Sequence, residues 1–162
     1  MSNVITAIED AMVARLMAKL PRTFRPAESF PDQAENFDFP VSNEAACYVR
    51  YDRSTYAGPD AEPRRAYAPM RTLSFEVIVL VRSLRGAQDG RVSSYDALEA
   101  VRLALQGQSF GGATAMAPAG DQLQARDAGV WRWAIRFTCR APAVAVADAG
   151  ERSTMLQRAE AS

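Results

Sequence analysis

Two long stretches of alternating side chains constrain the fold of this chain more than any other feature. In residues 71–82 and 130–140, large apolar side chains recur at every second position. This is the period of a β-strand, in which successive side chains point to opposite faces. One face of each stretch is apolar, so both strands are expected to pack against a core. The other face of 71–82 begins polar and ends apolar, and we expect it to be half covered. The apolar faces comprise Leu73, Phe75, Val77, Val79 and Val81 in the first stretch and Trp131, Trp133, Ile135, Phe137 and Cys139 in the second.

Two helices are predicted from apolar residues at spacings of three and four. The first covers residues 3–20 and ends before Pro21. The second covers residues 95–106, after a turn at 86–90, and is expected to face the sheet with one apolar side. The candidate helix caps are Thr6 (with Glu9), Ser2 or Asn3 for the first helix and Ser93 or Ser94 for the second. The residues expected to face the sheet from the second helix are Tyr95, Leu98, Val101 and Leu105.

Shorter strands are expected at residues 45–51, 114–117 and 122–126, with a hairpin turn after the last of these. Strands and helices in this order indicate a single α+β domain. Its length suits one domain, since domains typically contain roughly 100–200 residues.

Three segments are predicted to lack regular structure. Residues 21–43 contain four prolines and four phenylalanines, and read as an extended arm pinned onto the domain or onto a neighbour. Residues 52–69 read as a long polar hairpin loop. Residues 141–162 are alanine-rich with little to bury, so we expect a domain over 1–140 and a flexible C-terminal tail over 141–162. Protease sensitivity is expected at 58–66 and in the tail.

The composition excludes several kinds of chemistry. The chain has no histidine, which removes the commonest general base and the commonest zinc ligand. Cys47 and Cys139 lie in apolar strand-like runs and are expected to be small buried residues, for which a disulfide is not required. No set of nucleophile, acid and base and no metal set can be assembled. We therefore expect no enzyme activity, no cofactor and no metal.

Charge and hydropathy bear on partners and location. Lys and Arg number 19, as do Asp and Glu, so the basic excess usual in proteins that wrap nucleic acid is missing and only a local basic patch remains. The N-terminal segment lacks the continuous apolar stretch of a signal peptide. No run approaches the roughly 18 apolar residues of a membrane span. The expectation is a cytoplasmic protein without a membrane partner.

The candidate site is a row of arginines. Strand alternation places Arg132, Arg136 and Arg140 on one face, and Arg71 and Arg82 stand at the ends of the other long strand. Such a row could form a subunit interface or line a channel, where guanidinium groups meet carboxylates or phosphates. It could equally be the solvated side of a half-buried strand. If Arg132, Arg136 and Arg140 mediate assembly, their replacement by Glu should abolish the assembly and leave a folded monomer.

Two other sets of residues have simpler interpretations. Trp131, Trp133 and Phe137 lie on the face opposite the arginines, which favours core packing over stacking on bases. A group of carboxylates in the proline-rich arm has oxygens suited to Ca²⁺ or Mg²⁺ but lacks the spacing of a known loop, so a solvated loop is expected. This group comprises Glu28, Asp32, Glu35 and Asp38.

The order of these elements resembles a known family. The segments that carry the resemblance are Val-Arg-Tyr at 49–51, Phe-Glu-Val-Ile-Val-Leu-Val-Arg-Ser-Leu-Arg-Gly at 75–86 and Trp-Arg-Trp-Ala-Ile-Arg-Phe at 131–137. Over residues 3–140 the chain resembles the small tail proteins of Mu-like phages and prophages, which are related to the tail terminators of long-tailed phages. The resemblance implies a mixed, mainly antiparallel sheet of about four strands with two helices packed on one face.

The resemblance also implies a function. It implies a structural virion subunit, assembled in the host cytoplasm, that forms a hexameric ring on the virion tail. The ring would cap the tail tube, and the sheath in contractile tails, and would dock the head–tail connector, with DNA passing through the channel only transiently. The family brings no catalytic residues. The alternatives are a neck or head–tail joining protein of similar fold and a nucleic-acid-binding module that uses the arginine-rich strand face.

Overall fold

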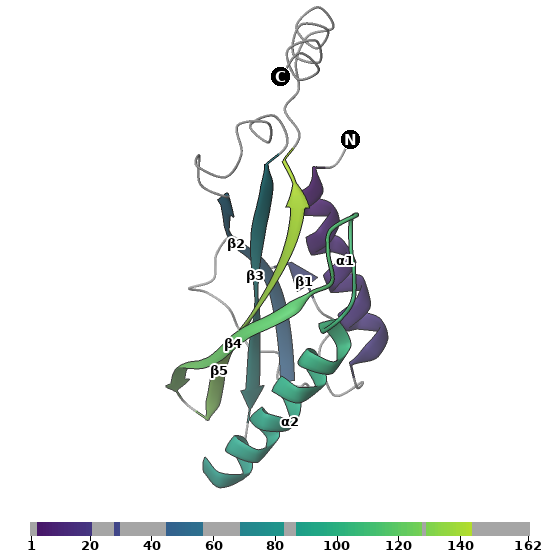
Figure 1. Ribbon diagram of the computed structural model, residues 1–162. Coiled ribbons are helices and arrows are strands. Elements are labelled where there is room, and N and C mark those ends of the chain that lie inside the picture. Colours follow the sequence, from purple (N-terminus) through teal and green to yellow (C-terminus); the bar gives the residue numbers. More distant parts are fainter. Residues whose placement is uncertain are drawn as a thin grey trace, which may run out of the picture.

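The structure is a computed structural model, and it describes residues 3–20, 28–29, 45–56, 69–82, 87–127 and 129–143 (Figure 1). Within these residues the chain forms two helices and five strands. In chain order they are α1 (Val4–Lys19), β1 (Glu28–Ser29), β2 (Ala45–Tyr56), β3 (Met70–Arg82), α2 (Ala87–Leu105), β4 (Ala117–Asp127) and β5 (Val130–Pro142).

The strands form one sheet in the order β1-β2-β3-β5-β4. Strands β2, β3, β5 and β4 pair antiparallel, whereas the two-residue β1 runs parallel to β2. Strand β3 lies at the centre and pairs along its whole length with β5, from Met70 opposite Pro142 to Arg82 opposite Val130. The expected α+β fold, with a mixed and mainly antiparallel sheet, is confirmed.

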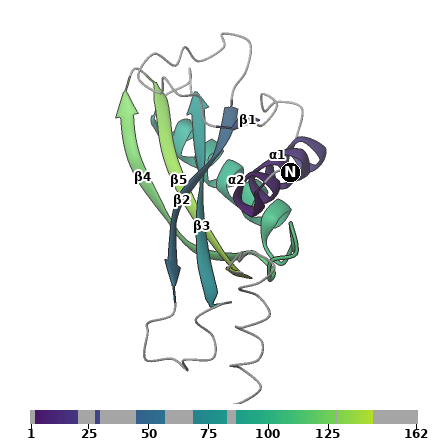
Figure 2. The ribbon, with the colours of Figure 1, turned by 90° about the horizontal axis from the view of Figure 1, so that it is seen from above.

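Both helices cover the same face of the sheet (Figure 2). Helix α2 packs on β3 and β5, and α1 packs on α2 and β2. The core lies between these layers. Its helical side chains are Ile8, Met12 and Leu16 from α1 and Ala97, Leu98, Val101, Ala104 and Leu105 from α2. These contacts confirm the predicted apolar sides of both helices, except that Tyr95 is half exposed and its ring meets that of Trp133 in a T-shaped contact.

The helix boundaries differ from the prediction at one end. Helix α1 begins as expected, with the Asn3 side chain accepting a hydrogen bond from the Thr6 backbone N–H at 2.9 Å. Helix α2 begins at Ala87, so the turn predicted at 86–90 is wrong from residue 87 onward. Ser93 and Ser94 lie inside this helix and do not cap it, and Ser94 is fully buried. Gly90 in the first turn of α2 and the two serines that follow resemble a turn in the sequence, but packing of the following apolar side overrides those weak local preferences.

The strand boundaries also bring corrections. Strand β2 continues to Tyr56, so the first five residues of the predicted loop are sheet, and residues 57–68 lie outside the described part of the chain. In place of the two weak strands predicted at 114–117 and 122–126 there is one strand, β4, which has register shifts near Ala119 and Gln124. It begins at Ala117, so the strand predicted over 114–116 is wrong. Proline and glycine within β4 suggested a break, but an edge strand tolerates both at irregular positions.

The ends of the chain and the arm fall mostly outside the described residues. Strand β5 runs to Pro142, two residues past its predicted end, and residues 144–162 of the expected tail are not described. Of the arm predicted as irregular, only Glu28 and Ser29 are described, and they form β1. No helix in the described ranges is long and apolar enough to cross a lipid bilayer.

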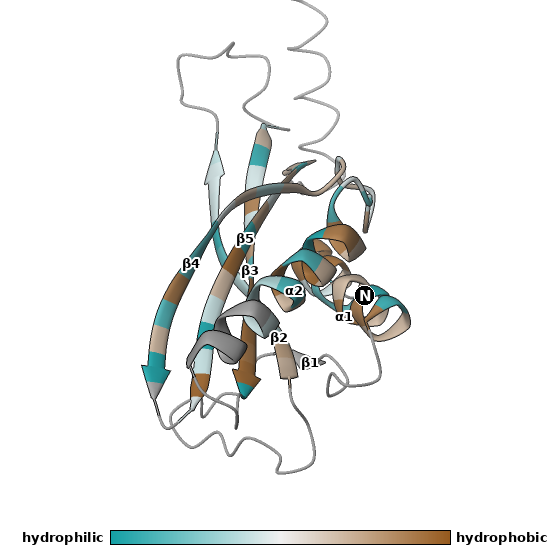
Figure 3. Ribbon diagram, turned by 90° about the horizontal axis from the view of Figure 1, so that it is seen from below, coloured by the Kyte–Doolittle hydropathy of each residue, from teal (hydrophilic) through white to brown (hydrophobic). Residues whose placement is uncertain are grey.

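The sheet has two unlike faces. The face toward the helices is apolar along β3 and β5, as predicted. The outer face of β3 becomes apolar toward its C-terminal end, where Ile78 is 1% and Leu80 8% exposed, so the expected half coverage is confirmed. Figure 3 shows this change along the strand, with hydrophobic colour toward the C-terminal end of β3, and a pale to hydrophilic far half of β2. The outer apolar cluster consists of Ala46, Tyr48, Ile78, Leu80 and Ala134.

Both cysteines are buried on the helix side of the sheet. Cys47 lies on β2 and Cys139 on β5, with the central strand between them, and both are free thiols. Burial raises the pKa of the Cys47 thiol to about 12 and that of the Cys139 thiol to about 11. A buried thiol of this kind stays protonated and is a poor nucleophile at neutral pH.

Candidate interaction surface on the outer face of the sheet

The predicted arginine row lies on the outer face of the sheet. Strand register pairs Arg132, Arg136 and Arg140 of β5 with Leu80, Glu76 and Thr72 of β3. The face opposite this row carries the aromatic residues, of which Trp131 and Phe137 are buried in the core. The predicted separation of arginines from aromatics is therefore confirmed.

The two arginines at the ends of β3 fall on different sides. Arg82 is opposite Val130 and lies two residues beyond Leu80, the partner of Arg132, so it belongs to the outer face. Arg71 is opposite Ala141, which is a core residue on the helix side. Eleven positions separate the two arginines, and an odd number of steps along a strand changes face. Arg71 therefore does not join the row.

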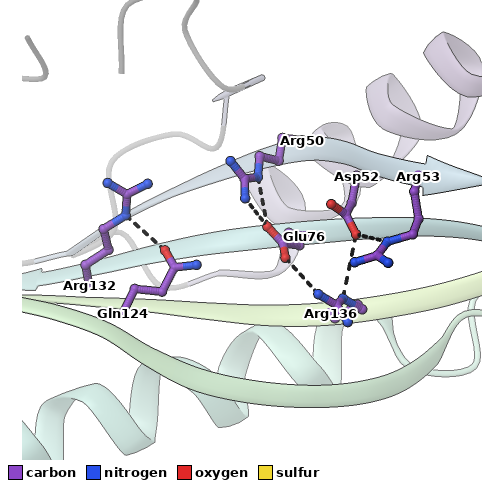
Figure 4. A network of polar contacts seen from close by, with 7 residues as sticks. All are labelled: Arg50, Asp52, Arg53, Glu76, Gln124, Arg132 and Arg136. Carbon is purple, nitrogen blue, oxygen red and sulfur yellow. Dashed lines mark hydrogen bonds and ion pairs between the residues drawn. The ribbon is translucent and has the colours of Figure 1, made fainter. Parts of the chain in front are cut away.

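A β-bulge concentrates charge in the middle of the outer face. The pairing of β2 with β3 passes from Tyr51–Phe75 to Arg53–Ser74 and leaves Asp52 without an opposite residue. A bulge places an extra residue on one strand, so Asp52 and Arg53 can both turn toward the same face. Figure 4 shows the two side chains side by side above β3.

Glu76 is the centre of the resulting network. Its side chain is only 8% exposed, and it lies on β3 between two arginines from the neighbouring strands. The Arg50 guanidinium donates two hydrogen bonds to Oε2, one of them from Nε at 2.8 Å, and Arg136 donates from Nη2 to Oε1 at 3.2 Å (Figure 4). Both oxygens of this buried carboxylate accept hydrogen bonds from guanidinium groups, which offsets the cost of removing it from water.

A second carboxylate extends the network toward solvent. Asp52 Oδ2 accepts a hydrogen bond from Arg53 Nε at 2.9 Å and lies 3.9 Å from Arg136 Nε. The Arg136 side chain is thus placed between Glu76 and Asp52, and both contacts are within its own subunit. The acids lie deeper than the bases, since Asp52 is 21% exposed whereas Arg53 and Arg136 are 60% and 43% exposed. The solvent consequently meets mainly guanidinium groups.

The other two arginines of the row have different surroundings. Arg132 Nε donates to the Gln124 side-chain oxygen at 3.1 Å, across to the second irregular point of β4. The Arg140 side chain is exposed and makes no ion pair with the described residues. Its backbone N–H donates to Thr114 Oγ1 at 2.8 Å, and its carbonyl accepts from the Thr114 N–H at 2.9 Å, which fixes the strand at this point.

The sequence interpretation missed half of this site. Arg50, Asp52, Arg53 and Glu76 were not singled out, because each is an ordinary charged residue within or beside a strand. A signal was nevertheless present: Glu76 interrupts a run of apolar residues, and an isolated charge on a buried strand requires a partner of opposite charge. The bulge that recruits Asp52 has no comparable signal in the sequence.

The arrangement can bind anionic groups but shows no metal centre. In the described residues, no group of three or more cysteine and carboxylate side chains is placed to hold a metal ion. Of the four acidic residues of the arm, only Glu28 is described, and only as part of β1, so that set lies outside the described side chains.

An aromatic cluster lies on the other side of the sheet, beside the edge strand. The rings of Tyr95 and Trp133 meet edge to face with centroids 6.0 Å apart, and the Arg126 guanidinium lies 4.6 Å from the Trp131 ring centre. The predicted core role of Trp131 and Phe137 is confirmed, whereas Trp133 is only partly buried.

Comparisons with known proteins agree with this architecture. Among solved structures the chain is similar to a chain in the structure titled "Virion of native gene transfer agent (GTA) particle", with a TM-score of 0.54 and 15% sequence identity. That match covers 88% of this chain and 100% of the other, and at this identity it shows a shared fold. No curated protein gives a significant match to the sequence. The model of the Gp37 protein family matches residues 12–160, which is most of the 162 residues, and the chain therefore belongs to the Gp37 protein family.

Proposed function

We propose that this protein is a structural subunit of a phage-like virion, and specifically a tail terminator. In this role, copies of the chain assemble into a closed ring, expected to be a hexamer, at the end of the tail tube. The ring stops further addition of tube subunits, and of sheath subunits in a contractile tail, and offers a surface to the head–tail connector. Assembly takes place in the host cytoplasm, and the finished ring stays in the virion tail.

The observation that carries this proposal is the fold match. The match covers an entire chain of a virion particle and 88% of this one, with a TM-score of 0.54. The family membership and the resemblance of 49–51, 75–86 and 131–137 to Mu-like tail proteins point in the same direction. The fold alone is compatible with several virion positions, so the terminator role rests on the resemblance.

The outer face of the sheet supports an assembly role. Arg53, Arg136 and Arg140 present guanidinium groups on one surface of a chain whose total charge is zero. In a closed ring each subunit uses one surface to contact a different surface of the next copy. A neutral chain with separated charges meets that requirement, because opposite charges on its own surfaces can pair between copies.

The test is the solution mass of the full chain, measured by light scattering over a range of protein concentrations. A hexamer, or a monomer that moves toward a hexamer as concentration rises, is the expected result. The preparation is then added to tail tube subunits during polymerisation, and tube lengths are measured by electron microscopy. Shorter tubes with a ring at one end are expected. Tubes of unchanged length with the ring bound at a connector would instead assign the chain to the neck of the virion.

A further inference from the structure

Among the described residues, exposed basic and acidic side chains lie on two opposite sides of the subunit. On the outer face of the sheet, Arg53 and Arg136 share Asp52, and Arg140 has no described acidic partner. On the helix side, Asp10 of α1 and Asp96 of α2 are exposed and form no ion pair with described residues. By contrast, Glu99 of α2 pairs with Arg102 at 2.6 Å.

We propose that the Arg53–Arg140 end of the outer face docks against exposed carboxylates on the helices of a second copy of this chain. The inference rests on the ring assembly proposed above and names the surfaces that make it. Arg53, Arg136 and Arg140 form the basic surface, and Asp10 and Asp96 supply the acidic surface of the next copy. The contact joins two different surfaces, so it can close a ring.

The recessed acids favour a protein carboxylate over DNA as the occupant. Asp52 pairs with Arg53 and Arg136, and Glu76 pairs with Arg136, so these acids cancel much of the long-range field of the two arginines. Binding to duplex DNA depends on a broad excess of positive charge, which a chain with 19 basic and 19 acidic residues lacks. What remains at short range is a set of fixed N–H donors. Arginine uses such donors to bind carboxylates with defined geometry.

The surface chemistry around these arginines fits a polar, directional contact. Register places Ser74 and Thr138 opposite one another beside Arg53, and Thr72 opposite Arg140, all on the outer face. Hydroxyl groups of this kind can donate to the second oxygen of a docked carboxylate. The apolar cluster of Tyr48 and Ile78 is buried at the other end of the face. The surroundings of the basic surface are therefore polar.

The test uses paired charge reversals in the full chain. The variant R53E/R140E keeps Arg136, which holds Glu76, and should therefore stay folded, with a circular dichroism spectrum and urea midpoint close to the parent. Its concentration for half-assembly should rise by at least tenfold, or its mass should fall to that of a monomer. Adding D10R/D96R to the same chain should restore assembly, because acidic side chains on the sheet of one copy then meet basic side chains on the helices of the next.

A matched control separates local docking from total charge. The variant K19E/R102E changes the net charge by the same amount but adds carboxylates to the helices and leaves the basic surface unchanged, so it should assemble at least as well as the parent. Raising the salt from about 0.05 M to about 0.5 M should weaken parent assembly, since the Debye length shortens from over 10 Å to a few ångströms.

The outcomes distinguish this inference from the proposed function. A parent ring that R53E/R140E leaves intact overturns the docking surface and keeps the ring. Loss of assembly that D10R/D96R does not rescue overturns the named acidic surface. An intact ring in R53E/R140E combined with loss of salt-sensitive binding to a short DNA duplex assigns the arginines to nucleic acid. A parent chain that stays monomeric at all concentrations and on tubes removes both the ring and the docking.

Discussion

At the scale of single residues, the fold is held by an acid in an unusual place. Glu76 lies in the middle of the central strand, directly before its apolar half, and is almost completely covered. Its position is tolerated because β2 and β5 each bring an arginine to it, so three strands are joined by one carboxylate. Burial of such a group without partners would cost several kcal/mol.

Replacement of Glu76 by alanine should therefore destabilise the domain. Arg50 and Arg136 would keep their charge and lose the buried acceptor, and because both are partly exposed the expected loss is about 1–3 kcal/mol. Urea unfolding followed by tryptophan fluorescence measures it. Glu76→Gln retains an acceptor oxygen and should lose less. Equal losses for the two variants would mean that packing, and not the ion pairs, is what the site contributes.

Two neighbouring glycines offer a second residue-scale comparison. Gly111 and Gly112 both have positive φ angles, of 58° and 76°, but a Cβ at Gly111 would lie 3.0 Å from Ile8 Cγ1 whereas one at Gly112 would meet nothing within 4 Å. Gly112→Ala should lose about 1 kcal/mol through backbone strain alone. Gly111→Ala should lose more, because Ile8 of the core must also shift. Thermal unfolding of both variants checks the order, and the reverse order would contradict this packing.

At the scale of secondary structure, the sequence predicted the elements whose pattern is set by burial. Strand β3 and the apolar face of β5 were predicted almost to the residue, because alternation there reports directly which side chains meet the core. Helix α2 and strand β4 were harder. A glycine and paired serines concealed the first two turns of α2, and every described side chain of β4 up to Arg126 is exposed, so its alternation carries no burial signal.

The same distinction applies to the candidate site. The faces of Arg132, Arg136 and Arg140 followed from alternation alone. The partners of Arg136 did not, because Glu76 and Asp52 come from other strands, and their approach depends on sheet order and on a bulge. Local pattern determines the face on which a residue lies, and only the tertiary pairing determines its neighbours.

Helix α1 allows an element-scale test. Its N-terminus is capped by the Asn3 side chain, which accepts from the Thr6 N–H at 2.9 Å. Asn3→Ala should lose about 1 kcal/mol, because the loss of a good cap leaves that donor to water. Asn3→Asp should keep the cap and the stability. The comparison is made by urea unfolding, and a stable alanine variant would show that packing of Ile8 and Met12 is enough to hold the first turn.

At the scale of the whole molecule, the two cysteines report on cooperative unfolding. Cys47 and Cys139 lie on strands separated by β3, and both are buried in the core. Local fraying would expose one without the other, whereas global unfolding exposes both. Their labelling by a thiol reagent near neutral pH should be slow and should proceed at equal rates. Faster labelling of Cys139 alone would identify the β4–β5 side as a separately opening unit.

Burial of the two cysteines fixes the sign of one contribution to the pH dependence of the free energy of unfolding. Burial raises the pKa of both thiols above the value of 9.0 for an exposed cysteine. Above about pH 9 the unfolded chain releases these protons while the folded chain retains them, so the free energy of unfolding should fall as the pH rises toward 11. The C47A/C139A variant, measured by urea unfolding at each pH, should show a shallower fall than the parent.

The bulge at Asp52 has a consequence for relatives of this chain. Up to Tyr51 the odd-numbered residues of β2 face the helices, but beyond the bulge Ser54 and Tyr56 take that side. A relative with one residue fewer at this point can keep both strands paired, yet it loses the extra side chain that brings a second carboxylate to Arg136. Insertions and deletions at a single alignment column, more than substitutions, should therefore separate relatives that carry the full charge network from those that carry only its Glu76 core.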